Sequence, residues 1–340
     1  MYSFHELADI VQNEIKNLKY PQQPELLYAP IVYSLEEGGK RIRPVALLMA
    51  CNLFRDEIDC AKPAALAVEV FHNFTLLHDD IMDRSDTRRG KPAVHTRWND
   101  NVAILSGDAM MIYAYKLLCG CDRRVLPQLL ETFNETAIGV CEGQQYDMDF
   151  ESRDDVTVDR YLEMIRLKTG VLLAGALKLG AICAEAQPWQ AELLYNFGIN
   201  VGLAFQLQDD LFDTYGDAAV FGKPIGGDIL AGKKTFLLTT ALKTADAATR
   251  GELLARRHVG GGENRNRARH LRPAGSPEDH RKGDRRLFPQ CRPNPQQPGS
   301  RDRTHRPAAG TGRNPVEPQK ITGLSKKWGQ RAPTAKRWKR

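Results

Sequence analysis

The sequence predicts an all-α protein, a single large helical bundle around a deep central cavity. Residues 1–255 are roughly half apolar, and the apolar positions recur every three or four residues, as they do in amphipathic helices. Several of these segments are apolar on nearly every side, which is typical of helices buried inside a large bundle. No alternating strand pattern with hairpin turns appears in them.

The helical pattern is clear from the N-terminus, where a single stripe carries Phe4, Leu7, Ile10, Val11, Ile15 and Leu18. After short breaks of Gly, Pro or Asp it continues through residues 43–54, 62–83, 93–118, 126–150, 158–183, 191–215 and 233–245. The central segments are long enough to line a deep cavity between the helices.

The composition changes abruptly after this helical part. Residues 256–340 carry 23 Lys and Arg against 6 Asp and Glu and hold 10 of the 19 prolines, whereas residues 1–255 have a net charge of −11. A segment so poor in aliphatic residues cannot bury enough surface to offset its loss of conformational entropy. We therefore divide the chain into a helical domain, residues 1–258, and a disordered basic tail rich in Pro, Arg and Gly, residues 259–340.

The seven cysteines show no CxxC pair and no spacing with histidine that is typical of a metal site. We expect them to be buried free thiols in a reducing compartment. The N-terminus lacks the pattern of a secretory signal, and no stretch approaches the ~18 apolar residues of a membrane span. We therefore predict a cytoplasmic protein without stable membrane insertion.

Three carboxylates end the apolar segment at residues 62–83. Asp79 and Asp83 are four residues apart, so both point the same way along one helix, with Asp80 beside them. His72, seven residues before Asp79, shares that face. Acids in this arrangement repel one another unless a cation compensates their charge. For this cluster alone, the alternative is a solvated acidic helix end.

The chain repeats the arrangement at the end of a second apolar helix. Asp209, Asp210 and Asp213 have the same spacing as the first three acids. Gln206 falls on the same face, four and seven residues before Asp210 and Asp213. Carboxylate oxygens suit Mg²⁺, which keeps part of its water shell and shares phosphate oxygens. Two such clusters predict several Mg²⁺ ions held against one diphosphate group.

Basic residues accompany both clusters. Arginine suits forked contacts with phosphate oxygens, and lysine supplies a mobile point charge. Each of these residues alone is more often a solvated charge than a ligand. Together with the acids and an apolar interior, they predict a substrate with a diphosphate head and an apolar tail. They are Lys40, Arg41 and Arg43 after a Gly pair, Arg88 and Arg89 after the first cluster, Lys168 beside Thr169, and Lys223, Lys233 and Lys234 after the second cluster.

The motifs GGKRIRP, HDDIMD followed by RRGKP, KTG, FQLQDDLFD and GKPIGGD followed by GKKT occur in this order over roughly residues 20 to 255. In this series the chain resembles the trans-isoprenyl diphosphate synthases of the polyprenyl synthetase family, in particular the short-chain farnesyl and geranylgeranyl diphosphate synthases. The resemblance implies an all-helical homodimer of the isoprenoid synthase type and a Mg²⁺-dependent prenyltransferase. Its reaction would be the head-to-tail condensation of isopentenyl diphosphate with an allylic diphosphate to a C15 to C20 prenyl diphosphate.

The resemblance also implies roles for individual residues. The catalytic acids would be Asp79, Asp80, Asp83, Asp209, Asp210 and Asp213. Asp79, Asp83 and Asp209 among them would bind Mg²⁺, with about three ions in each active site. Isopentenyl diphosphate would be held by Lys40, Arg43, His72 and Arg89. The allylic diphosphate would be held by Arg88, Lys168, Thr169, Gln206, Lys223 and Lys233.

Other functions are open at this point. A class I terpene synthase also ionises a prenyl diphosphate, but it usually carries one DDxxD motif and a different second metal motif. A non-catalytic partner subunit would be expected to lose the acid clusters, which this chain keeps. A further alternative is an inactive synthase whose basic tail contacts nucleic acid, although nothing in residues 1–255 indicates a nucleic-acid partner.

We interpret the tail as the product of a frameshift. Back-translation of residues 269–294 with free choice of synonymous codons, read one base later, permits AIYDRLGVRKITEKAIGDYFRNAVRT. That product has helical periodicity and balanced charge, as the missing last helices of the family should have. One extra base in a guanine tract at Gly260–Gly262 would shift the frame. Loss of the last helices would expose apolar surface, so we predict poor solubility or instability of the chain as written.

Product length is predicted from the side chains below the first acid cluster. Thr75, one turn or about 6 Å below Asp79, is too small to block a growing tail. Phe74 and Phe71 are the bulky candidates for a cavity floor, and in the family an aromatic residue at the position of Phe74 accompanies short products. Alternatively, both are core aromatics packed between helices.

Overall fold

A computed structural model describes residues 1–36, 38–216, 227–230 and 232–255, and all structural statements concern these residues. The predicted tail, residues 259–340, and the candidate ligand Lys223 lie outside them. The chain divides into a larger unit, residues 1–209 and 232–243, and a smaller unit, residues 210–231 and 244–340.

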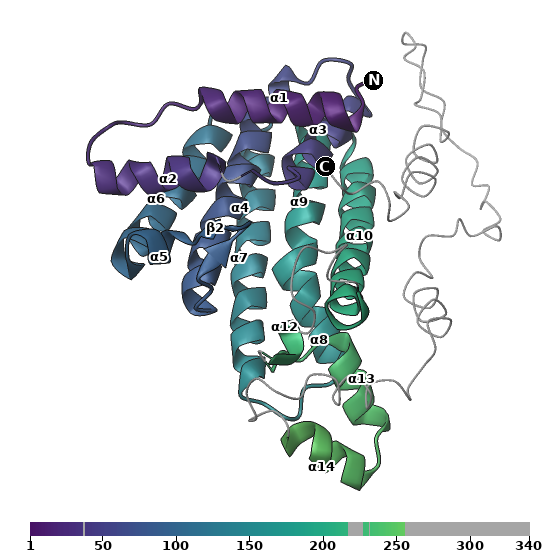
Figure 1. Ribbon diagram of the computed structural model, residues 1–340. Coiled ribbons are helices and arrows are strands. Elements are labelled where there is room, and N and C mark those ends of the chain that lie inside the picture. Colours follow the sequence, from purple (N-terminus) through teal and green to yellow (C-terminus); the bar gives the residue numbers. More distant parts are fainter. Residues whose placement is uncertain (37, 217–226, 231, 256–340) are drawn as a thin grey trace, which may run out of the picture. The chain divides into compact units, whose positions relative to one another are not determined.

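The described residues are helical almost throughout, which confirms the predicted all-α class (Figure 1). The larger unit contains α1 (Phe4–Asn17), α2 (Glu25–Glu36), α3 (Ile42–Asn52), the 3₁₀ turn η1 (Asp59–Ala61), α4 (Lys62–Met82), β1 (Thr87–Arg88), β2 (Lys91–Pro92), α5 (Val94–Arg97), α6 (Asp100–Leu118), α7 (Leu126–Glu151), α8 (Val158–Ile165), the π-helical turn η2 (Arg166–Gly170), α9 (Val171–Cys183), and most of α10 (Pro188–Tyr215) and α13 (Phe236–Thr244). The smaller unit contains the end of α10, α12 (Gly227–Leu230) and α14 (Ala247–Ala255).

Local sequence signals explain how α1 forms. Its first turn carries a capping box, in which the Ser3 hydroxyl accepts a hydrogen bond from the Glu6 backbone and the Glu6 carboxylate accepts one from the Ser3 backbone. Leu7, Val11 and Ile15 are buried on one face, so the predicted apolar stripe is confirmed. The same stripe places α1 against α3 and α4.

Two predicted helical segments are divided in the structure. The segment at 93–118 breaks before α6 because the Asn99 side chain accepts a hydrogen bond from the Val102 backbone and caps the new helix. The segment at 158–183 contains η2, a π-helical turn between α8 and α9. The short hairpin of β1 and β2 was not indicated by the sequence pattern.

Helices α4, α7 and α9 run side by side through the larger unit (Figure 1). α4 packs mainly on α6, and α9 packs on α3 and α7. Nearly every residue of α9 is buried, as its apolar sequence predicted. Gly180 allows α9 to approach α3 closely, because a Cβ atom there would lie 2.0 Å from the Leu47 carbonyl oxygen.

A buried ion pair anchors the N-terminal end of α3. The Arg41 guanidinium contacts the Glu69 carboxylate of α4 and donates to the Leu35 carbonyl oxygen, both at 2.5 Å. Only 4% of Arg41 and 2% of Glu69 are exposed. The sequence grouped Arg41 with Lys40 and Arg43 as a possible phosphate ligand. That grouping is wrong, because Arg41 is turned into the core, where it neutralises Glu69.

The described cysteines are free thiols. Cys51, Cys121 and Cys183 are buried, as predicted, but Cys119 and Cys141 are exposed. The prediction of burial was wrong for these two because they lie on outward-facing positions at the end of α6 and on α7. In the described part of the chain, no helix combines the length and the apolar character that crossing a membrane requires.

A cleft of about 370 Å³ lies between the ends of α1 and α6 and the start of α4. Its lining includes Leu18, Tyr20, Leu66 and Tyr113. Leu66 precedes Asp79 on α4 by about 20 Å along the helix axis. This cleft is therefore distinct from the cavity that the sequence predicts next to the acid clusters.

Candidate active site

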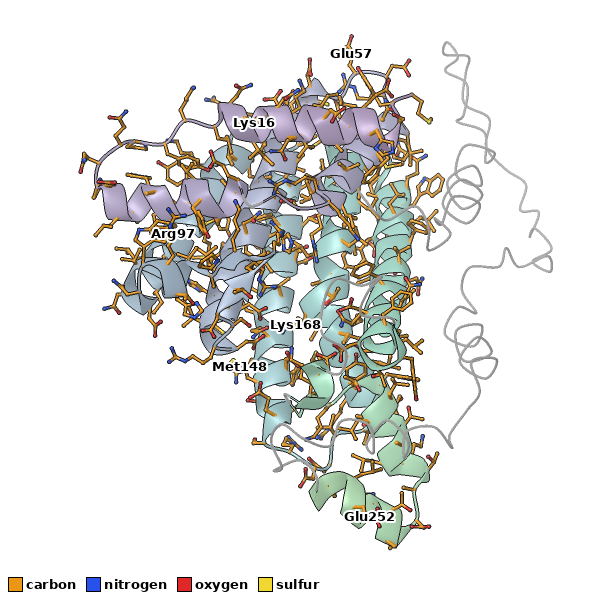
Figure 2. All side chains as sticks on the ribbon, in the orientation of Figure 1. Lys16, Glu57, Arg97, Met148, Lys168 and Glu252 are labelled. Carbon is orange, nitrogen blue, oxygen red and sulfur yellow. The ribbon has the colours of Figure 1, made fainter. Side chains whose placement is uncertain are left out.

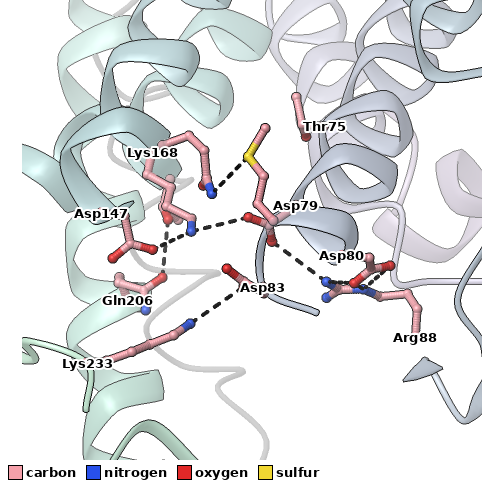
Figure 3. A network of polar contacts seen from close by, with 12 residues as sticks. Thr75, Asp79, Asp80, Asp83, Arg88, Asp147, Lys168, Gln206 and Lys233 are labelled. Atoms are coloured by element: carbon pink, nitrogen blue, oxygen red, sulfur yellow. Dashed lines mark hydrogen bonds and ion pairs between the residues drawn. The ribbon is translucent and has the colours of Figure 1, made fainter. Parts of the chain in front are cut away.

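The first acid cluster lies at the C-terminal end of α4, where the negative end of the helix dipole adds to the negative charges (Figure 3). Asp79 and Asp80 are in the last turn, and Asp83 follows the helix as its C-cap. Asp80 is buried, and Asp79 and Asp83 are half-buried. Burial raises the pKa of Asp83, and the charge of Asp79 raises it further. The cluster therefore requires nearby cations to remain ionised.

A tight hairpin supplies the first two cations. β1 and β2 pair Arg88 with Lys91, and the two residues between them, Arg89 and Gly90, have φ values of 52° and 79°. Positive φ at both central positions is the geometry of a type I′ turn, whose twist matches that of the strands it joins. The hairpin thus presents two consecutive arginines, Arg88 and Arg89, next to the end of α4.

Arg88 binds the acid cluster directly. Its Nε donates to Asp80 Oδ1 at 2.9 Å and to Asp80 Oδ2 at 3.2 Å, and its Nη2 lies 3.7 Å from Asp79 Oδ2 (Figure 3). Burial alone would lower the pKa of Arg88, but the hydrogen bond and charge of Asp80 outweigh burial and raise it. Burial raises the pKa of Asp80, and Arg88 opposes that shift.

A second basic group lies on the other side of the hairpin. Arg89 donates to the Gly38 carbonyl oxygen, and Arg43 Nη1 lies 3.1 Å from His72 Nε2. Burial, followed by the charge of Arg43, lowers the pKa of His72 well below its usual value. His72 is therefore neutral and accepts the hydrogen bond from Arg43. Lys40 is exposed in the same loop.

The π-helical turn supplies a second cation to the acid cluster. Lys168 Nζ donates to Asp147 Oδ2 at 2.6 Å and lies 3.4 Å from Asp79 Oδ1 (Figure 3). Burial alone would lower the pKa of Lys168, but the charges of Asp147 and Asp79 outweigh burial and raise it. Asp147 was not among the residues predicted from the sequence. The sequence feature that could have indicated it is a pair of acids, Asp147 and Asp149, near the end of α7.

Two glycines on neighbouring helices permit this arrangement. A Cβ atom at Gly143 of α7 would lie 2.2 Å from the Lys168 backbone nitrogen, and one at Gly202 of α10 would lie 2.6 Å from the Gly170 Cα. Both helices therefore touch the backbone of η2. One turn after Gly143, Asp147 binds Lys168, and one turn after Gly202, Gln206 accepts from the hydroxyl group of Thr169 at 3.2 Å.

The second acid cluster lies at the end of α10. Asp209 is half-buried and belongs to the larger unit, whereas Asp210 and Asp213 belong to the smaller unit. Asp210 is buried, and Asp213 accepts a hydrogen bond from the Asp228 backbone at 3.0 Å. Their shared helix supports the predicted spacing on one face.

The lysines after the second cluster have different surroundings. Lys233 Nζ lies 3.9 Å from Asp83 Oδ2, which adds a third cation to Arg88 and Lys168 at the first acid cluster (Figure 3). Lys234 is buried and lies 3.8 Å from Asp154 Oδ1.

Aromatic rings lie below the acid cluster in the direction of the start of α4. Phe71 and Phe74 are buried with their ring centroids 5.4 Å apart, and Phe133 of α7 lies 5.2 Å from Phe71. Phe74 also contacts the ring of His78 at 4.8 Å. Thr75 donates its hydroxyl to the His72 carbonyl oxygen at 2.8 Å. Phe133 was not predicted to lie here because it is distant from Phe71 in the chain.

The carboxylates at the end of α4 suit a hard cation. Asp79 Oδ1 is buried and receives no hydrogen bond, although Lys168 Nζ is 3.4 Å away. Among the described residues, no three His, Cys, Asp or Glu side chains form a complete metal cage. Mg²⁺ does not need such a cage, since it binds one or two carboxylates together with water and phosphate oxygens. Asp79 and Asp83 therefore fit this ion.

The sequence pattern of the polyprenyl synthetase family matches residues 24–269. The chain belongs to this family. A short chain isoprenyl diphosphate synthase of Methanocaldococcus jannaschii is 41% identical over 248 residues, 72% of this chain and 76% of that protein. The predicted family, fold class and prenyltransferase class are thereby confirmed.

Solved structures of this family have a similar fold. The structure of a geranylgeranyl pyrophosphate synthase matches with a TM-score of 0.79 and 42% identity, over 84% of this chain and 90% of that one. A geranylgeranyl pyrophosphate synthase from Corynebacterium glutamicum, complexed with isoprenyl diphosphate and magnesium, matches with a TM-score of 0.75 and 27% identity, over 84% and 91% of the two chains.

The close approach at Gly143 leads to a prediction for this polyprenyl synthetase. We expect Gly143→Ala to lower the free energy of unfolding by about 1–3 kcal/mol, because the methyl group would overlap the Lys168 backbone. The displaced lysine would also reduce prenyltransferase activity. Gly139→Ala, one turn earlier on α7, is the matched control, since its Cβ would lie 3.3 Å from the nearest Val171 side-chain atom. Equal unfolding midpoints in urea for the two variants would contradict the prediction.

Proposed function

We propose that this chain condenses isopentenyl diphosphate head-to-tail with an allylic diphosphate and releases a C15 to C20 prenyl diphosphate. The proposal rests on one observation. Arg88, Lys168 and Lys233 come from three different segments, and each forms an ion pair with an acid of the α4 cluster. Such a site combines ligands for metal ions with ligands for phosphate. The class I terpene synthase alternative is less well supported, because the chain carries two DDxxD motifs.

Asp79, Asp83 and Asp209 are the proposed ligands of Mg²⁺, and the presence of magnesium in the complex of the Corynebacterium glutamicum relative supports the identity of the ion. We expect about three ions, since a diphosphate offers several oxygens for ions to share. Bound Mg²⁺ would supply positive charge that stabilises the pyrophosphate as it leaves.

Arg88, Lys168 and Lys233 would bind the allylic diphosphate, helped by Thr169 and Gln206. Ionisation of the allylic C–O bond places negative charge on the pyrophosphate, and these cations lie where that charge would develop. Asp147 would act as a positioning residue, because it holds the Lys168 ammonium group. Lys223, the remaining candidate in this set, lies outside the described residues.

Lys40, Arg43, His72 and Arg89 would bind isopentenyl diphosphate. Arg43 Nε is buried and donates to no described residue, so a phosphate oxygen is an acceptor that suits it. A neutral His72 would orient Arg43 without adding repulsion to the arginines. The buried rings below the cluster would exclude water from the allylic cation, and the departing pyrophosphate would accept the proton that the condensation releases.

Phe74 and Phe71 are the proposed floor for the growing tail, with Phe133 as a support behind Phe71. Thr75 would leave the space above them open. The depth of Phe74 and Phe71 below Asp79, about 7–12 Å along the helix, favours short products.

A second copy of this chain is the proposed partner of α6 and α7. Ile112 of α6 and Ile138 of α7 are 63% and 61% exposed. The two helices are joined next to these residues by a hydrogen bond of 2.6 Å from the Tyr115 hydroxyl to Asn134. We call these two exposed side chains the apolar face of α6 and α7, and exposed apolar residues of this kind favour a homodimer.

The interpretation of residues 259–340 as a frameshift product also stays a proposal, since these residues lie outside the described part. The nucleotide sequence tests it: codons that cannot encode the helical frame would rule it out. A cytoplasmic location is likewise a prediction.

Removal of a proposed metal ligand should abolish most of the activity. We expect Asp79→Ala and Asp209→Ala each to lower incorporation of labelled isopentenyl diphosphate by roughly 10²- to 10³-fold, because charge on the leaving pyrophosphate would lose a stabilising ion. Asp9→Ala, an exposed acid of α1, is the control. Circular dichroism should show the same helix content in all three variants. Unchanged turnover in Asp79→Ala would overturn the proposed function.

Product length should respond to the proposed floor. We expect the double variant Phe71→Ala, Phe74→Ala to make products longer by one or more C5 units, measured by chromatography of the dephosphorylated alcohols. Phe150→Ala removes a buried ring at the far end of α7, where it stacks on Tyr146, and should leave the product unchanged. The same product from the double variant and the parent would place the floor elsewhere.

Charge on the apolar face should separate the proposed dimer. We expect the double variant Ile112→Glu, Ile138→Glu to have half the mass of the parent in multi-angle light scattering after size exclusion. Leu193→Glu on α10, where the leucine is 51% exposed, is the control and should leave the mass unchanged. A monomeric parent protein would contradict the proposal.

A further inference from the structure

Four of the described cysteines lie close together near the C-terminal ends of α3 and α9. Cys51 lies in the last turn of α3, Cys60 in η1, Cys121 just after α6 and Cys183 at the end of α9. Cys60 is in contact with Cys51 and with the backbone of Cys183. The Cys183 and Cys121 thiols also interact with each other. The four cysteines come from separate elements of the chain, so the sequence did not predict that they lie together.

This thiol group lies far from the proposed active site. In Figure 2, Glu57, three residues before Cys60 in the chain, lies at the top of the view, and Lys168 lies well below it. α4 begins directly after η1 and reaches the acid cluster only after about 30 Å. Chemistry at the thiols therefore has no direct access to the diphosphate ligands.

Cys51 and Cys60 are close enough to be joined by a small movement. Their Sγ atoms are 3.9 Å apart, and a disulfide bond requires about 2.05 Å. The connection between them, residues 53–58, contains no regular helix. A shift of about 2 Å can therefore be taken up by this connection without disturbing α3 or α4.

The two thiols differ in accessibility. Cys60 is half-buried, and Arg55 Nη1 lies 3.9 Å from its sulfur. A half-buried sulfur can be reached by a small oxidant, which a fully buried sulfur cannot. Cys51 is fully buried, and burial raises the pKa of its thiol to about 12. Oxidation should therefore start at Cys60, with Cys51 as the second thiol.

We propose that Cys60 is an oxidation site that forms a reversible disulfide bond with Cys51 when the oxidant is a peroxide. The Cys60 thiolate attacks one peroxide oxygen, the O–O bond breaks, and hydroxide leaves to give a sulfenic acid. The Cys51 sulfur then attacks the Cys60 sulfur, the S–O bond breaks, and a second hydroxide leaves. With the two thiol protons, hydrogen peroxide is reduced to two waters and two thiols are oxidised to one disulfide.

The bond would join the end of α3 to the start of α4. Closing this loop restricts the unfolded chain, so the oxidised protein should be more stable than the reduced protein. The acid cluster at the other end of α4 would be unaffected, and prenyltransferase activity should therefore be the same in both forms. The proposal does not depend on the proposed function, because it concerns only these thiols.

Peptide mapping of the full chain tests the proposal. The reduced protein is treated with hydrogen peroxide, alkylated and digested with trypsin, which cleaves after Arg55 and separates Cys51 from Cys60. We expect a cross-linked pair of peptides, residues 42–55 with residues 56–84, that disappears on treatment with dithiothreitol. The oxidised protein should also melt about 5 °C higher than the reduced protein.

Three variants separate this reaction from general oxidation. In Cys51→Ala, Cys60 should be trapped as a sulfenic acid that reacts with dimedone, and the melting temperature should not rise. In Cys60→Ser, the linked peptides should be absent. Cys119→Ser changes an exposed thiol and should leave the linked peptides as in the parent.

Two results would overturn the proposal. One is a parent protein in which Cys51 and Cys60 stay reduced while Cys119 or Cys141 is oxidised. The other is a linkage of Cys60 to Cys183 or to a second chain instead of Cys51. Both can be read from the parent protein alone, so the test does not require that the variants fold.

Discussion

Repulsion among the carboxylates at the C-terminal end of α4 is the constraint on which the rest of the active site depends. Burial and the helix dipole both disfavour the charged forms of these acids. Arg88, Lys168 and Lys233 approach from a hairpin, a π-helical turn and the segment before α13, and each pairs with an acid of the cluster. Each pairing offsets repulsion among the acids and places positive groups beside negative ones, as a metal-bound diphosphate would require.

Close backbone packing holds the cations in place. Lys168 lies in the π-helical turn, and such turns inside α-helices are frequent at functional sites. Gly143 and Gly202 let α7 and α10 touch this turn, and one helical turn further each helix supplies a polar side chain to it. Gly143 and Gly202 thus determine the position of Lys168, because larger residues would keep α7 and α10 away from the π-helical turn.

Helix α4 combines three environments along its length. Near its middle, Glu69 holds Arg41 in the core and ties α4 to α3. Phe71 and Phe74 follow as a layer of buried rings, and the acids come last. A substrate with a charged head and an apolar tail matches this order. The rigidity of one continuous helix keeps the distance between the rings and the acids constant, which is what a defined product length requires.

The sequence by itself determined the helical class, the family and both acid clusters, because apolar periodicity and DDxxD spacing are local properties of the chain. It also placed Lys168 among the candidate phosphate ligands that accompany the acids. Tertiary structure alone decided that Arg41 belongs to the core, that Asp147 holds Lys168, and that the thiols of Cys51 and Cys60 meet. These contacts join residues from different helices, and which faces of two helices touch depends on the packing of the whole bundle.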